Sequence, residues 1–145
     1  MTSIQELIPV LQIAIGPVIL ISGVGLLLLS MTNRLSRVIE RARTLLAISD
    51  TASSPVRERV LAQIDILWGQ ARLIRVSILL ASTSVLCAAC LIIVLFVAAL
   101  FKIEDAWLVS ILFVACMFSL IGSLIAFITD INRSLSAFKV ELYER

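Results

Sequence analysis

The most reactive side chains in this sequence are the thiols of Cys87, Cys90 and Cys116. Cys87 and Cys90 have the CxxC spacing of redox proteins, and that chemistry requires a stabilised thiolate in a partly exposed, electropositive setting. All three cysteines lie within long stretches without charge, where hydrocarbon disfavours a thiolate and excludes oxidants and aqueous metal ions. We therefore interpret them as small apolar packing residues and expect neither a redox centre nor a metal site.

Other groups with catalytic potential are scarce. The chain has no histidine, so a histidine-activated nucleophile cannot form, and no glycine-rich phosphate-binding loop occurs in the sequence. Its 10 acidic residues are scattered and lack the pairing that is typical of general acid–base catalysis. We expect no catalytic residues and no cofactor, which predicts a protein that is not an enzyme.

The charge-free stretches cover residues 7–33, 76–101 and 106–129. A helix needs about 20 apolar residues to cross a bilayer, and this chain is 61% hydrophobic with a mean hydropathy of +1.12. The sequence predicts an all-α membrane protein, a single membrane domain over residues 1–145 with spans at about 8–31, 76–101 and 106–129.

Basic residues are distributed very unevenly between the two sides of these spans. The region between the first and second spans holds Arg34, Arg37, Arg41, Arg43, Arg57, Arg59, Arg72 and Arg75. Three more basic residues follow the third span, whereas Lys102 alone lies between the second and third spans. The positive-inside rule therefore predicts an N-terminus outside and a C-terminus in the cytoplasm.

Residues 32–75 are expected to be helical rather than loop-like. Apolar residues recur at every third or fourth position on both sides of a polar turn at 50–54. Ser54 suits the cap of the helix that follows, with Pro55 at its first position. The sequence thus predicts a long cytoplasmic helical hairpin that continues the first and second spans, with Trp68 buried inside it.

The tail, residues 130–145, is also amphipathic. Its apolar stripe comprises Ile131, Leu135, Phe138 and Leu142, spaced four, three and four residues apart. Such a helix either packs on the hairpin or lies on the lipid surface, and the spacing does not separate these two interpretations.

The arginines nearest the spans are Arg34, Arg37, Arg72 and Arg75, which we take as candidate contacts for anionic lipid. The alternative is that the arginines only set topology and form intrahelical ion pairs, such as those that Glu40 could make with Arg37 and Arg43. Nucleic acid is not an expected partner, because a net charge of +2 with interspersed acids lacks a dense basic face.

The first span contains a candidate kink at Gln12, Gly16 and Pro17. Pro17 cannot donate a hydrogen bond to the Ile13 carbonyl, so this carbonyl and the Gln12 amide could line a polar constriction in a pore. The alternative is an ordinary packing kink, which membrane helices tolerate.

Small residues at helical spacing indicate close helix contacts in the second and third spans. The candidate packing residues are Ser77, Ala81, Ala115, Ser119 and Ser123. Spacing alone does not distinguish contacts within one chain from contacts between chains. Because three spans make only a small bundle, we expect a homo-oligomer.

The run from Asn33 to Arg43, after a proline-bearing first span, resembles a family of small bacterial membrane proteins catalogued as domain of unknown function 2721. That family carries an N-R-x-x-R-x-x-[DE]-R-x-R run after its first helix, matched here by Asn33, Arg34, Arg37, Glu40, Arg41 and Arg43. Its third span ends in an acidic residue, to which Asp130 corresponds. The resemblance implies a multi-pass protein of the bacterial cytoplasmic (inner) membrane and implies no activity.

Two functional hypotheses follow. The first is a non-enzymatic, homo-oligomeric scaffold that organises lipids or protein partners through its basic cytoplasmic hairpin. The second is an oligomeric ion or small-solute channel lined by the kinked first span.

Overall fold

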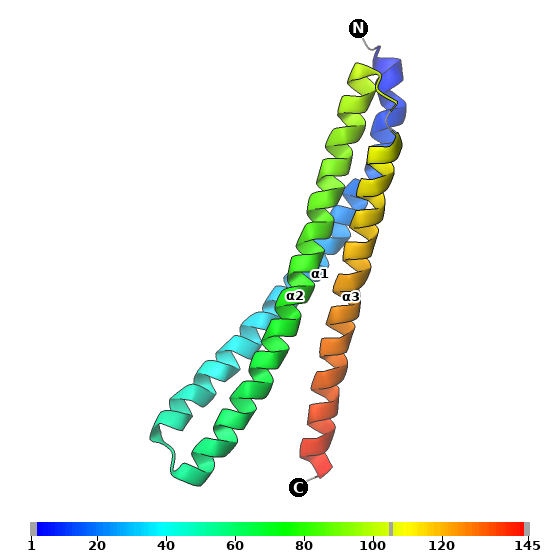
Figure 1. Cartoon of the computed structure of the whole chain (residues 1–145). Coiled ribbons are helices and arrows are strands. Elements are labelled where there is room, and N and C mark those ends of the chain that lie inside the picture. The colour runs from blue at the N-terminus through cyan, green and yellow to red at the C-terminus, as the bar shows by residue number, and fades with distance from the viewer. Residues whose placement is uncertain (1–2, 105, 144–145) are drawn as a thin grey trace. The chain divides into compact units, whose positions relative to one another are not determined.

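The computed structural model describes residues 3–104 and 106–143, apart from the side chains of residues 140 and 141. These residues form three long helices, α1 (Ile4–Thr51), α2 (Ser54–Phe101) and α3 (Ala106–Tyr143) (Figure 1). Each contains a stretch long and apolar enough to cross a membrane. The prediction of an all-α chain is therefore confirmed, and so is the prediction of three helices long and apolar enough to span a membrane.

α1 and α2 are separated by only two residues, 52 and 53. The Ser53 carbonyl accepts hydrogen bonds from the amides of Val56 and Arg57, at 3.1 and 2.9 Å. Ser53 therefore occupies the N-cap position, one residue earlier than the expected Ser54. Pro55 lies in the first turn, where its missing N–H leaves no carbonyl unpaired.

α2 ends in a left-handed cap. Lys102 has a φ of 53°, and the amide of Ile103 donates to the Ala98 carbonyl at 3.0 Å. This bond spans five residues, as in the Schellman motif that terminates many helices. Glycine usually occupies the left-handed position, so a lysine there carries a conformational cost of about 1 kcal/mol.

α1 contains Pro9 and Pro17 and nevertheless remains one continuous helix. The missing hydrogen bond at Pro17 thus does not divide the element. Membrane helices tolerate such a loss where neighbouring groups satisfy the freed carbonyl.

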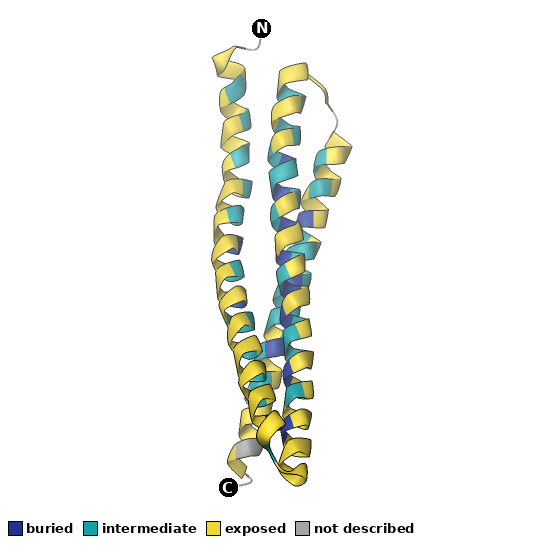
Figure 2. Ribbon diagram, turned by 90° about the vertical axis from the view of Figure 1, so that its left-hand side faces the viewer, coloured by how far each residue is buried: buried dark blue, intermediate teal, exposed yellow. Residues whose placement is uncertain are grey.

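Burial along the helices follows a seven-residue period. The buried residues of α2 at this spacing are Val60, Leu67, Ile74, Ala81 and Ala88, and the interleaved set is Ser77, Ser84 and Leu91. In α3 the buried residues are Cys116, Ser123 and Asp130, again seven apart. This 3-4 alternation is typical of helices that pack in the manner of a left-handed coiled coil. Figure 2 shows the buried positions in dark blue beside intermediate ones in teal, while most of the remaining helix surface is exposed.

The chain divides into two compact units, each built from parts of all three helices. The first unit comprises residues 1–28 and 79–122, and the second comprises residues 29–78 and 123–145. Ala81, Ala88 and Cys116 are buried in the first unit, whereas Met31 and Ile74 are fully buried in the second.

Trp68 is 71% exposed, so the expectation that it is buried is wrong. The reason is local, because Trp68 directly follows Leu67, which occupies the buried position of the seven-residue repeat. One step along a helix rotates a side chain by about 100° and takes it off the buried stripe. The tail residues Leu135 and Phe138 are likewise exposed, by 62% and 61%.

Candidate ligand site in the second unit

The second unit contains a partly buried ion pair between α1 and α3. Nε of Arg34 lies 2.5 Å from Oδ2 of Asp130, and Nη2 of Arg34 donates to Oγ of Ser134 at 2.7 Å. The Asp130 side chain is 1% exposed and the Arg34 side chain is 31% exposed. Oγ of Ser134 in turn donates to the Asp130 carbonyl at 3.0 Å. Arg34 is therefore held at two of its nitrogens.

The positions of both charges follow from the seven-residue repeat. Asp130 lies seven residues after the buried Ser123, and Arg34 lies three residues after the buried Met31. Both side chains consequently start on inward faces of their helices. A buried carboxylate is costly unless a cation accompanies it, and Arg34 supplies that cation. Oδ1 of Asp130 accepts no hydrogen bond from any described residue.

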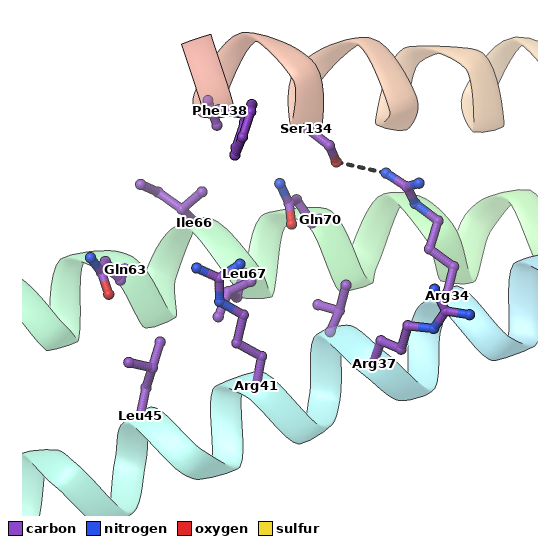
Figure 3. Close-up of a pocket in the computed structure, with 12 residues that line it drawn as sticks. Arg34, Arg37, Arg41, Leu45, Gln63, Ile66, Leu67, Gln70, Ser134 and Phe138 are labelled. Carbon is purple, nitrogen blue, oxygen red and sulfur yellow. Dashed lines mark hydrogen bonds between the residues drawn. The ribbon is translucent and has the colours of Figure 1, made fainter. Parts of the chain in front are cut away.

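Next to this pair lies a cavity of about 470 Å³ between the three helices of the second unit. Its polar lining consists of Arg34, Arg37, Arg41, Gln63, Gln70 and Ser134, and its apolar lining consists of Val38, Leu45, Ile66, Leu67, Ala137 and Phe138. In Figure 3 the labelled side chains come from all three helices: Arg37 and Arg41 from α1, Gln63 and Gln70 from α2, and Ser134 and Phe138 from α3.

The described lining of the cavity carries positive charge that no described acidic side chain offsets. Arg34, Arg37 and Arg41 are three and four residues apart and therefore share one face of α1. No acidic residue is found in the cavity lining among the described residues. Within that part of the chain the ion pair of Arg34 is the only one, so neither expected pair of Glu40, with Arg37 or with Arg43, is formed. The charges of Arg37 and Arg41 thus have no counter-charge among the described residues.

The sequence had singled out four arginines as lipid contacts, and the structure separates them into two groups. Arg34 and Arg37 line the cavity, whereas Arg72 and Arg75 are exposed on α2 and do not. Arg41 was not among the candidates, although its position four residues after Arg37 is the signal for a shared face.

Gln63 and Gln70 were also missed. They lie seven residues apart on α2 and both line the cavity. That spacing is visible in the sequence, but an uncharged amide on a helix carries no signal for ligand binding on its own.

The candidate pore residues of α1 lie in the first unit. Gly16 and Pro17 line a second cavity of about 220 Å³, whose other lining residues are Leu20, Ala88, Leu91, Phe113, Cys116 and Met117. Gln12 is exposed and does not line this cavity. The structure therefore does not bring the Gln12 amide and the Pro17 kink together in a polar constriction.

Small residues do mark helix contacts, through hydrogen bonds from hydroxyls to backbone carbonyls. In the second unit Oγ of Ser77 donates to the Ser123 carbonyl and Oγ of Ser123 donates to the Ser77 carbonyl, both at 2.8 Å. In the first unit Oγ of Ser119 donates to the Leu80 carbonyl at 2.6 Å. The two bonds between Ser77 and Ser123 are reciprocal, and the bond from Ser119 to Leu80 runs one way. Small side chains permit such bonds where helices approach closely.

Two further packing candidates have different surroundings. Ala81 is buried, at 1% exposure, but Ala115 is exposed and the buried position belongs to the next residue, Cys116. Oγ of Ser84 donates to the Cys116 carbonyl at 3.0 Å, which is a second hydroxyl-to-carbonyl bond between α2 and α3 in the first unit.

Cys87 and Cys90 are half-buried and free, and the buried Cys116 is also free. Among the described residues no group of three or more His, Cys, Asp or Glu side chains is arranged to hold a metal ion.

A family model described as "Protein of unknown function (DUF2721)" matches residues 14–140. No curated protein and no solved structure matches the chain.

Proposed function

The chain belongs to the DUF2721 family, whose model covers most of its length, and from this premise we propose that it is a non-enzymatic organiser of anionic lipid at a membrane surface. The three candidate spans make it a multi-pass membrane protein. The proposed membrane is the bacterial cytoplasmic membrane, with residues 32–75 forming a cytoplasmic helical hairpin. The orientation rests on the excess of arginine in that segment over the single Lys102 on the opposite side.

One observation carries this proposal. Of the eight arginines in residues 32–75, Arg34 alone forms an ion pair with a described residue. The other seven are all exposed: Arg37, Arg41, Arg43, Arg57, Arg59, Arg72 and Arg75. Ion pairs with described residues therefore do not account for these seven arginines. Contact with anionic headgroups is worth about 1 kcal/mol for each cation near the surface.

We also propose that the protein works as a homo-oligomer. In the second unit Trp68, Leu135 and Phe138 are each more than 60% exposed. If this unit lies in the cytoplasm, water would contact these large apolar side chains, and covering them with a second copy removes that unfavourable contact. Light scattering of the detergent-solubilised protein should give a mass of at least two chains, and Trp68→Gln should lower it. A monomer at every concentration would contradict this part of the proposal.

The lipid proposal is tested with spin-labelled lipids in vesicles that contain the protein. Labelled phosphatidylglycerol should be motionally restricted to a greater extent than labelled phosphatidylcholine, and added salt should reduce the difference. The double variant Arg72→Gln and Arg75→Gln should weaken this preference, whereas Arg72→Lys and Arg75→Lys should retain it. Equal restriction of the two lipids would overturn the proposal.

A further inference from the structure

We infer that the cavity lined by Arg34, Arg37 and Arg41 is a binding site for one phosphate ester. This inference deepens the proposed function and rests on it, because it assigns one anion to a defined position rather than to a diffuse basic surface. The phosphate could belong to a lipid headgroup or to a free phosphorylated compound, and both would present the same chemistry to the cavity.

The first argument is charge. Arg37 and Arg41 are one helical turn apart, and like charges at this spacing destabilise a helix. No described carboxylate lines the cavity to offset them. An anion between the two guanidinium groups would convert this repulsion into two charge-assisted interactions.

The second argument is the fixed orientation of Arg34. Its guanidinium has five N–H donors, and Asp130 and Ser134 each engage one of them. Because Asp130 already neutralises Arg34, this residue acts as a positioned donor, whereas Arg37 and Arg41 supply the net charge. A donor that is held in place before binding loses little side-chain entropy when the ligand arrives.

The third argument is the mixed lining. Gln63 and Gln70 supply uncharged amide donors and acceptors, while Ile66, Leu67 and Phe138 supply apolar surface. A volume of about 470 Å³ lies within the range of small-molecule sites. It exceeds what a bare phosphate fills, so the lining favours a phosphate that carries an uncharged, hydroxyl-bearing organic group.

The experiment uses delipidated, full-length protein in neutral detergent and isothermal titration calorimetry. Four probes are compared: dihexanoyl phosphatidylglycerol, dihexanoyl phosphatidylcholine, glycerol 3-phosphate and inorganic phosphate. We expect saturable binding of one phosphatidylglycerol or one glycerol 3-phosphate per chain, and no saturable binding of phosphatidylcholine. Saturation by phosphatidylglycerol alone identifies a lipid as the source, and saturation by glycerol 3-phosphate identifies a free compound.

Two matched variants each remove two positive charges from residues 32–75. Arg37→Gln with Arg41→Gln should weaken binding by about tenfold or more, because each loses a hydrogen bond to a charged group. Arg57→Gln with Arg59→Gln is the control, since both residues are exposed and outside the cavity lining. Equal affinity of the cavity variant and wild type for these probes would refute the inference. An equal loss of affinity in the control variant would refute it too, and so would saturable binding of inorganic phosphate but of no phosphate ester.

Failure of this site is distinguishable from failure of the proposed function. The cavity variant could bind the probes normally while Arg72→Gln with Arg75→Gln abolishes the lipid preference in vesicles. That result would support the proposed organisation of anionic lipid and refute the phosphate-ester site in the cavity. If vesicles show no preference for anionic lipid but glycerol 3-phosphate binds the cavity, the phosphate-ester site is supported and the proposed organisation of anionic lipid is refuted.

Discussion

Arg34 and Asp130 are separated by 96 positions in the chain and form an ion pair with Nε and Oδ2 2.5 Å apart. The pair joins α1 to α3 within the second unit. The two partners have unequal surroundings, because the carboxylate is enclosed whereas the guanidinium keeps access to the surface. This inequality leads to a prediction that a simple salt-bridge count would not make.

Arg34→Leu should destabilise the protein more than Asp130→Leu. Removing the arginine leaves a buried carboxylate without its cation, which costs roughly 3–5 kcal/mol. Removing the aspartate leaves an arginine that can turn toward solvent. The double variant should recover most of the loss, so reversible unfolding of all four proteins in mixed micelles provides the measurement. Strictly additive effects would show that the two residues do not interact.

The reciprocal bonds between Ser77 and Ser123 predict a strong dependence on side-chain size. Both residues are fully buried, so Ser77→Leu or Ser123→Leu should force the helices apart and cost about 1–3 kcal/mol or more. Ser→Ala at either position removes one hydrogen bond and should cost only about 0.6 kcal/mol. The same unfolding assay compares them, with Ser82→Leu, at an exposed position of α2, as the control. Equal effects at Ser82 and Ser77 would contradict the buried contact.

Lys102→Gly should stabilise the end of α2. Lys102 adopts a positive φ, which glycine accepts without the cost of about 1 kcal/mol that a side chain imposes. Lys102→Ala keeps a side chain and should give no such gain, which makes it the matched control. Thermal unfolding in detergent checks both, and a destabilised glycine variant would argue against the left-handed cap.

Orientation can be read from an engineered cysteine at the turn between α1 and α2. In a chain whose three native cysteines are replaced by serine, Ser53→Cys should react with membrane-permeant maleimide in intact cells and not with an impermeant reagent. Lysis should expose it to both reagents. Labelling of Ser53→Cys by the impermeant reagent in unbroken cells would reverse the proposed topology.

The first span should not conduct. Gln12 is exposed and the cavity beside Pro17 is lined by apolar side chains, so neither supplies a polar path within one chain. The fluorescence of an ion indicator entrapped in vesicles that contain the purified protein should therefore stay unchanged when an ion gradient is applied. Ion flux that changes with Gln12→Leu or Pro17→Ala would favour the channel hypothesis instead.

By itself, the sequence determined the helical elements. Charge-free stretches and recurring apolar residues predict a helix that continues the span at about 8–31 as far as a turn at 50–54, and a second helix from Pro55 into the next span. The structure has these helices at Ile4–Thr51 and Ser54–Phe101. The helices were predictable because helical hydrogen bonds are local and because a membrane span depends on the length of an apolar segment. Both features are encoded by neighbouring residues. Arg34 and Arg37 were candidates for contact with anionic lipid because they lie next to the first span, and the structure places both in the cavity lining.

Only the tertiary structure decided how each helix is rotated about its axis. A change of one residue, about 100° of rotation, separates the buried Leu67 from the exposed Trp68 and the buried Cys116 from the exposed Ala115. The same rotation brings Arg34 against Asp130. No local pattern contains this information, because the rotation is set by the fit of side chains from three helices that are distant in sequence.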